Sequence, residues 1–107
     1  MVENCGNAVS GNAVRVEESV PDGELAALCK ALGHPARVRI LRHLLAQESC
    51  HFGDLSSVVD LSPSTVSQHV TVLKEAGLIV SWADERWVCY CVNADRLAVL
   101  KRLVAAL

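Results

Sequence analysis

The chain has 107 residues, of which 51% are hydrophobic and 21% are charged, so a single small globular domain is expected and a disordered chain is excluded. No apolar run approaches the roughly 18 residues of a membrane span, and the N-terminus lacks the pattern of a signal peptide, which predicts a cytoplasmic protein without membrane contact. The net charge of −2 shows no excess of basic residues of the kind that favours nucleic-acid binding. It does not exclude DNA binding, because the N-terminal tail holds much of the negative charge.

The first half of the chain predicts a tail followed by helices. Residues 1–20 show no periodicity and are expected to form a mobile tail, so the folded domain is assigned to residues 21–107. Leucines at helical spacing predict a first helix that stops at Gly33, and Pro35 suits the first position of a second helix. Residues 52–59 are predicted to form a short third helix.

The next stretch predicts the second helix of a helix-turn-helix. Ser62 suits an N-cap, Pro63 suits the first helical position, and Gly77 ends the helix. One buried stripe is expected from the spacing of Val66, Val70 and Leu73. Two short helices joined by a three- or four-residue turn are the helix-turn-helix pattern.

After Gly77 the apolar period changes from helical to two. Residues 78–83 and 87–92 therefore predict two strands joined by a tight turn, which is a wing, and Asn93 can cap a last helix. The expected fold is mostly α with a β-hairpin wing, a winged helix-turn-helix of about five helices and two strands.

The second helix of such a motif enters the major groove of DNA. Its buried stripe leaves six polar residues on the other faces, namely Ser64, Thr65, Ser67, Gln68, His69 and Thr71. Gln can bind adenine through two hydrogen bonds, and Ser and Thr can bind bases or phosphates. Such residues also suit a solvated helix face, but the wing and the turn chemistry favour double-stranded DNA as the partner.

Three stretches resemble the ArsR/SmtB family of metalloregulatory repressors. They are Ala31–Leu41 (ALGHPARVRIL), Leu61–Ile79 with its central STVSQH, and the wing strand Arg86–Asn93. The resemblance covers roughly residues 24–104. It implies a homodimer that sits on an imperfect palindromic operator and leaves it when an inducer binds, with no enzymatic activity and no organic cofactor.

The resemblance also assigns roles to residues. Base contacts fall on Ser64, Ser67, Gln68 and His69, with Thr65 beside them, and Arg86 at the wing tip lies near the minor groove or a phosphate. Asp84 and Glu85 depart from the family's basic wing tip, since carboxylates repel phosphates. The dimer is expected to form through the first and last helices, with interface positions at Leu25, Leu28, Cys29, Leu100, Leu103 and Val104.

Five cysteines are many for this length, and they are Cys5, Cys29, Cys50, Cys89 and Cys91. Because their number is odd and no export signal is present, a disulfide framework is not expected. The zinc site of the family's last helix is expected to be absent, since Leu97 stands where a His is needed. Family members that sense arsenic, cadmium or lead carry thiolates at the start of the helix-turn-helix, where this chain has Cys50 followed by His51.

Further ligands have to come from elsewhere in the chain. Cys5 in the tail could reach Cys50 in either subunit, because fifteen extended residues span roughly 50 Å. Cys89 and Cys91 point to one face of their strand, and with Val88, Tyr90 and Val92 as the inward set both thiols are expected to face outward. The candidate metal ligands are therefore Cys50, Cys5, Cys89 and Cys91, with His51 as a further candidate.

The leading hypothesis is a repressor released by a thiophilic metal(loid), with As(III) or Sb(III) favoured over Cd(II), Pb(II) and Hg(II). A second hypothesis makes oxidation or persulfidation the signal. The family's redox sensors pair a cysteine on the second helix with one on the last, which this chain lacks, so Cys89 and Cys91 would form a different pair. A third hypothesis is a winged helix used only for protein–protein contact. An enzyme is disfavoured, because no phosphate loop or nucleophile–base pair is recognisable.

Overall fold

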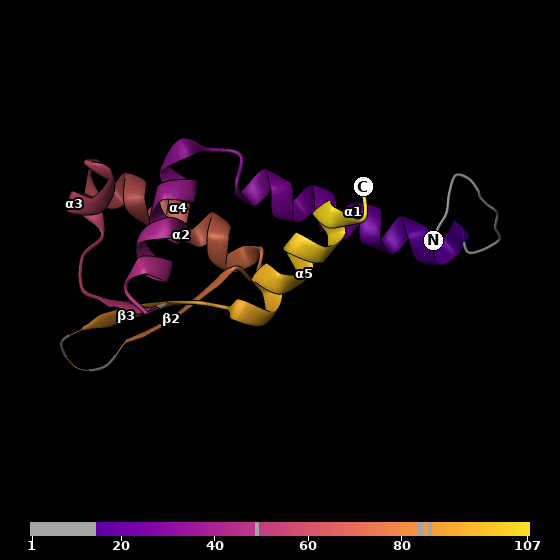
Figure 1. Cartoon of the computed structure of the whole chain (residues 1–107). Coiled ribbons are helices and arrows are strands. Elements are labelled where there is room, and N and C mark those ends of the chain that lie inside the picture. Colours follow the sequence, from indigo (N-terminus) through magenta and orange to yellow (C-terminus); the bar gives the residue numbers. More distant parts are fainter. Residues whose placement is uncertain (1–14, 49, 84, 86) are drawn as a thin grey trace.

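The computed structural model describes residues 15–48, 50–83, 85 and 87–107 (Figure 1). Within them the chain forms five helices and a three-stranded antiparallel sheet. In chain order the elements are α1 (Arg15–Ala31), α2 (Pro35–Ala46), β1 (Cys50–Phe52), α3 (Ser56–Val59), α4 (Pro63–Glu75), β2 (Ile79–Ala83), β3 (Val88–Val92) and α5 (Ala94–Ala105). Figure 1 shows α1 and α5 side by side, with α2, α3 and α4 gathered next to the sheet. None of the helices in these ranges is long and apolar enough to cross a membrane.

The start of the folded region differs from the prediction. Helix α1 begins at Arg15, so residues 15–20 of the predicted tail are helical, and only residues 1–14 of that tail lie outside the described residues. Residues 15–20 contain only two apolar side chains, Val16 and Val20, and the following Pro21 usually stands at the start of a helix and not inside one, so the pattern predicts a later start.

The sheet contains a strand that the sequence did not predict. Residues Cys50–Phe52 form β1, which pairs antiparallel with β3 and makes β3 the central strand of the order β1-β3-β2. The predicted helix over residues 52–59 shrinks to α3, because Gly53 turns the chain at φ +98°. The Asp54 carboxylate then accepts hydrogen bonds from both the backbone N–H and the hydroxyl of Ser56, at 2.9 and 2.8 Å.

Helix α4 forms as its sequence predicts. The Ser62 hydroxyl accepts the Thr65 N–H, and Pro63 occupies the first turn. Val66, Val70 and Leu73 are all buried, which confirms the predicted stripe. They join a single core with the inner residues of α2, α3, α5 and the sheet, which include Ile40, Leu44, Leu55, Leu78, Ile79 and Leu97.

Helices α1 and α5 pack against each other within one chain. Arg96 of α5 forms an ion pair with Glu24 of α1, and its Nε donates to the Ala76 carbonyl at the end of α4, 3.2 Å away. Leu28 and Leu100, which are among the predicted interface residues, are buried in the core of the single chain. Leu25 and Leu103 are half-buried, while Cys29 and Val104 are exposed. The interface over these residues stays a prediction, and Leu25, Cys29, Leu103 and Val104 are those of its residues with side-chain surface left exposed in the single chain.

Candidate nucleic-acid interface and thiol cluster

Helix α4 presents a polar face to solvent. Ser64, Ser67 and Gln68 are exposed, so all three predicted contacts are free to approach a base edge. Thr65 is half-buried, and its hydroxyl lies 2.9 Å from the Ser62 hydroxyl at the helix start. The Thr71 hydroxyl donates to the Ser67 carbonyl at 2.9 Å. The exposed residues among the predicted base contacts therefore lie in the first two turns of α4.

His69 has a different environment from the other predicted base contacts. Its Nδ1 lies 3.3 Å from Nη1 of Arg37, and its ring centroid lies 4.4 Å from that of His34. Burial lowers the pKa of His69, and the nearby charges of His34 and Arg37 lower this pKa further. Sequence reasoning missed this contact, because it joins positions 32 residues apart.

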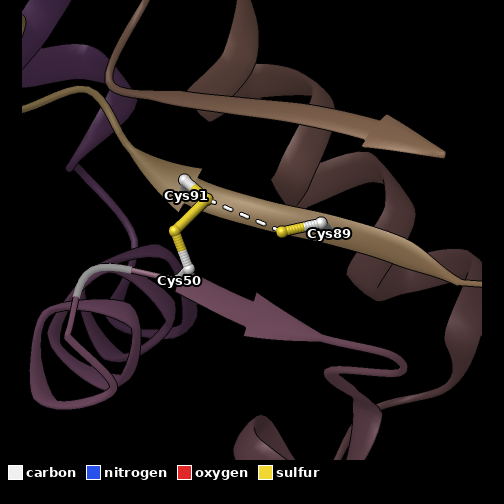
Figure 2. The surroundings of a disulfide bond; sticks show 3 residues. All are labelled: Cys50, Cys89 and Cys91. Atoms are coloured by element: carbon white, nitrogen blue, oxygen red, sulfur yellow. Dashed lines mark hydrogen bonds between the residues drawn. A yellow bond between two sulfur atoms is a disulfide. The ribbon is translucent and has the colours of Figure 1, made fainter. Parts of the chain in front are cut away.

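Three cysteines meet on the sheet (Figure 2). Cys50 on β1 and Cys91 on β3 are register partners with Cα atoms 4.1 Å apart, and their sulfurs form a disulfide. The Cys89 sulfur lies 3.6 Å from that of Cys91, and the three sulfurs lie within 4.8 Å of one another. The sequence analysis, which expected no disulfide framework, missed this bond, because the pairing of β1 with β3 brings together two cysteines separated by 41 residues.

The predicted exposure of Cys89 and Cys91 is also wrong, although their side of the strand is right. Register partners share a face of the sheet, so Cys89 lies between Phe52 and Trp82 on the face opposite the core. Cys89 is nevertheless only 3% exposed and Cys91 6%, while Phe52 is 67% and Trp82 55% exposed. Strands on both sides of β3 shield the thiols, which a two-stranded wing could not do.

Fewer side chains of β3 pack against the core than predicted. Val92 belongs to the core and Tyr90 packs against it, but Val88 is exposed near the wing tip. The pKa of Tyr90 is raised by burial and, to a smaller extent, by the negative charge of Asp54. Asp54 itself has a lowered pKa, chiefly because its carboxylate accepts hydrogen bonds from Ser56.

His51 lies away from the thiol cluster. It pairs with Tyr90 on the core-facing side, its Nδ1 lies 3.0 Å from Nε2 of His43, and its Nε2 lies 3.2 Å from the Asp54 carbonyl. Both ring nitrogens are thus engaged, and His51 is corrected from a candidate ligand to a link between α2 and β1. Two other candidates, Cys5 and Arg86, fall outside the described residues.

Helix α4 has an exposed polar face and packs with α2, α3 and the β2–β3 wing. This arrangement is that of the winged helix-turn-helix class of DNA-binding regulators. A family profile described as "Bacterial regulatory protein, arsR family" matches residues 34–81. The biofilm growth-associated repressor of Agrobacterium fabrum is 37% identical over 84 residues, which are 78% of this chain and 68% of that protein. The HTH-type transcriptional regulator YgaV of Escherichia coli is 36% identical over 72 residues, 67% of this chain and 73% of that protein.

A solved structure of reduced HlyU from Vibrio cholerae superposes with a TM-score of 0.66 at 29% identity, covering 81% of this chain and 92% of that one. The chain belongs to the ArsR family of bacterial regulatory proteins. It is a DNA-binding transcriptional repressor and not an enzyme. This assignment confirms the predicted family and replaces the hypothesis of a module used only for protein–protein contact.

Proposed function

We propose that this repressor leaves its operator when As(III) or Sb(III) binds the thiolates of Cys50, Cys89 and Cys91. The observation that carries the proposal is the distance between the three sulfurs, none of which lies more than 4.8 Å from another. Soft thiolates suit soft ions, and As(III) takes three sulfur ligands in the family precedents. Burial of Cys89 and Cys91 favours a small inorganic ion that these sulfurs can enclose.

Binding requires the reduced cluster. The Cys50–Cys91 bond has to accept two electrons and two protons from a cellular thiol reductant, which a cytoplasmic location supplies. The three thiols then release their protons as they coordinate the ion. Cys5 remains a predicted additional ligand, and Cd(II), Pb(II) and Hg(II) remain less favoured ions for the same sulfurs.

The position of β1 explains how coordination would reach the DNA. Cys50 lies at the start of β1, which leads through Gly53 and Asp54 directly into α3 and then α4. A change in how β1 sits on β3 therefore moves the helix-turn-helix. The two reading helices of a dimer then no longer match major grooves about 34 Å apart, and a coupling of about 1–3 kcal/mol is enough for a several-fold to hundred-fold loss of affinity.

The DNA complex is proposed to contain a homodimer on an imperfect palindrome. Exposed Val104 and Cys29, with half-buried Leu25 and Leu103, provide an apolar surface on α1 and α5. In this arrangement Ser64, Ser67 and Gln68 read base edges in the major groove. Arg86 is proposed to contact the minor groove or a phosphate from the wing tip.

The test is fluorescence anisotropy on DNA from upstream of the protein's own gene, at a fixed salt concentration and with a thiol reductant. As(III) and Sb(III) should release the wild-type protein, whereas Zn(II) should not. Cys50→Ser, Cys89→Ser and Cys91→Ser should each lose the response. Cys29→Ser changes an exposed thiol outside the cluster and should keep it, with sedimentation confirming that this change on the proposed dimer surface leaves the assembly intact. A full As(III) response in Cys50→Ser would refute the proposal.

A second candidate signal is thiol oxidation, and the Cys50–Cys91 disulfide favours it. An oxidant such as a peroxide or a persulfide takes two electrons from these thiols, and a sulfur–sulfur bond forms. The related structure from Vibrio cholerae was described in a reduced form, which is consistent with a redox couple in such proteins. Mass spectrometry after peroxide or persulfide treatment separates the two signals, because unmodified thiols with unchanged DNA affinity would remove this candidate.

A further inference from the structure

Arg37 joins three helices through one side chain. It lies in the first turn of α2, and its Nε donates to the Ala31 carbonyl at 2.6 Å while its Nη2 donates to the Lys30 carbonyl at 3.3 Å. These two carbonyls belong to the last residues of α1, where a helix lacks internal donors for its own acceptors. A guanidinium is a favourable partner at that negative end of the helix dipole. The third contact of Arg37 is to His69 on α4.

The Arg37–His69 contact has only one possible direction. A guanidinium carries only donors, so Nη1 donates and Nδ1 of His69 accepts at 3.3 Å. The acceptor must be unprotonated, and the neutral ring therefore carries its proton on Nε2. The ring of His34 lies against His69 and is itself fixed, because its Nδ1 accepts the Ala36 N–H at 3.0 Å. His69 is thus held by groups of its own chain.

Beside this contact, α1 and α4 are separated by an open hollow. The hollow has a volume of about 280 Å³ and is lined by Ala27, Lys30, Ala31, Val72, Glu75 and Ala76. Three of the six lining residues are alanines, so few large apolar side chains fill the space between the two helices there. The polar bridge from the end of α1 through Arg37 to His69 supplies a fixed connection next to the hollow.

We propose that Arg37 and His69 are positioning residues, which hold the reading helix α4 at a set orientation to α1. His69 then serves DNA binding through its contact with Arg37 and does not read a base. Since α1 is the helix proposed to pair across the dimer, the bridge sets how the two reading helices of a dimer lie relative to each other. The inference concerns DNA binding itself and does not depend on which inducer the thiols bind.

A double-mutant cycle on operator affinity tests the bridge. Arg37→Gln and His69→Ala should each weaken operator binding about tenfold, a change that corresponds to about 1.4 kcal/mol. The double variant should have the same operator affinity as the single variant that binds less tightly, because either change alone already breaks the same connection. In a direct-contact arrangement the two effects would instead multiply, and Arg37→Gln would reduce the slope of log affinity against log salt by about 1. Either of those results would overturn the proposal.

His69→Asn keeps the assay interpretable if His69→Ala folds poorly. The Asn side-chain oxygen can accept the Arg37 hydrogen bond near the position of Nδ1, and it does not titrate. This variant should retain near wild-type operator affinity at neutral pH, with circular dichroism and sedimentation confirming the same fold and assembly for all variants. Affinity as weak as that of a folded His69→Ala variant would contradict the proposal.

The bridge also predicts a pH dependence, since a protonated His69 can no longer accept from Arg37. The charged and titratable groups that face it are Arg37 and His34. Because burial and the neighbouring charges lower the pKa of His69, the operator affinity of the wild type should fall only at a pH below the ordinary histidine pKa of about 6.5. This contribution to the fall should be absent in His69→Asn. A wild-type profile identical to that of His69→Asn would overturn the proposal. Long-range ¹⁵N–¹H spectra should show His69 protonated on Nε2 alone at neutral pH.

Discussion

Gly77 is the residue at which α4 ends and the wing begins, and its replacement by alanine should destabilise the domain measurably. The Leu78 N–H donates to the Leu73 carbonyl at 3.0 Å, and the Gly77 N–H donates to the Lys74 carbonyl at 2.9 Å. This pair of bonds is the Schellman motif, which requires a left-handed residue, and Gly77 has φ +81°. A Cβ added there would also lie 3.4 Å from Cγ and Nε of Arg96.

The expected cost follows from these two observations. A left-handed conformation costs an L-residue about 1–2 kcal/mol, and the contact with Arg96 is within ordinary reach, so it adds little. For a domain of this size, about 1 kcal/mol corresponds to a Tm about 4–8 °C lower. Gly23→Ala is the matched control, because Gly23 lies inside α1 and an added Cβ would meet open space. Replacing a glycine inside a helix should raise the free energy of unfolding by about 0.5–1 kcal/mol.

Thermal and urea denaturation of the two variants, at one protein concentration and with a thiol reductant, measure the difference. Gly77→Ala should unfold at lower temperature and lower urea concentration than the wild type, and Gly23→Ala at higher values. Equal stability of Gly77→Ala and the wild type would refute the reasoning, because it would show that the α4–β2 junction does not need a left-handed residue.

Three further outcomes are expected. Gln68→Ala should weaken operator binding by about 1–3 kcal/mol per half-site with an unchanged salt slope, measured by anisotropy, because a glutamine on adenine is a bidentate base contact. Protein oxidised to the Cys50–Cys91 disulfide should bind far less As(III) than the reduced protein until a reductant restores two thiols, measured by thiol titration and bound arsenic after desalting. Leu73→Ala removes a fully buried side chain of α4 and should cost about 2–5 kcal/mol of unfolding free energy, measured in urea.

The elements that could be predicted are those whose signals are local. Helix α4 has its cap, its first-turn proline, its buried stripe and its terminal glycine within sixteen consecutive residues, so each signal supports the same structure. The hairpin of β2 and β3 follows from a change of apolar period across a short turn. Strand β1 has only three residues and no pattern of its own, and it exists because β3 offers a free edge far along the chain.

The thiol cluster depends on that unpredicted strand. The sequence identified Cys50, Cys89 and Cys91 as candidates from their chemistry, but their grouping requires the register of β1 on β3. The same register places Phe52 beside Cys89, which explains why thiols on the outer face of the sheet are buried. His51 was misassigned for the same reason, since a one-residue step along β1 turns its side chain to the opposite face.

Helix α4 therefore receives two connections that the sequence alone does not reveal. One comes from the sheet, where β1 carries Cys50 beside the β3 sulfurs and leads along the chain into α3 and then α4. The other comes from the end of α1, through Arg37 and His69. A repressor needs α4 to be firmly placed when it is bound to DNA and displaced by its signal. In the arrangement proposed here, the bridge to α1 supplies the firm placement, and a change at the sulfurs acts on the same helix through β1 and α3.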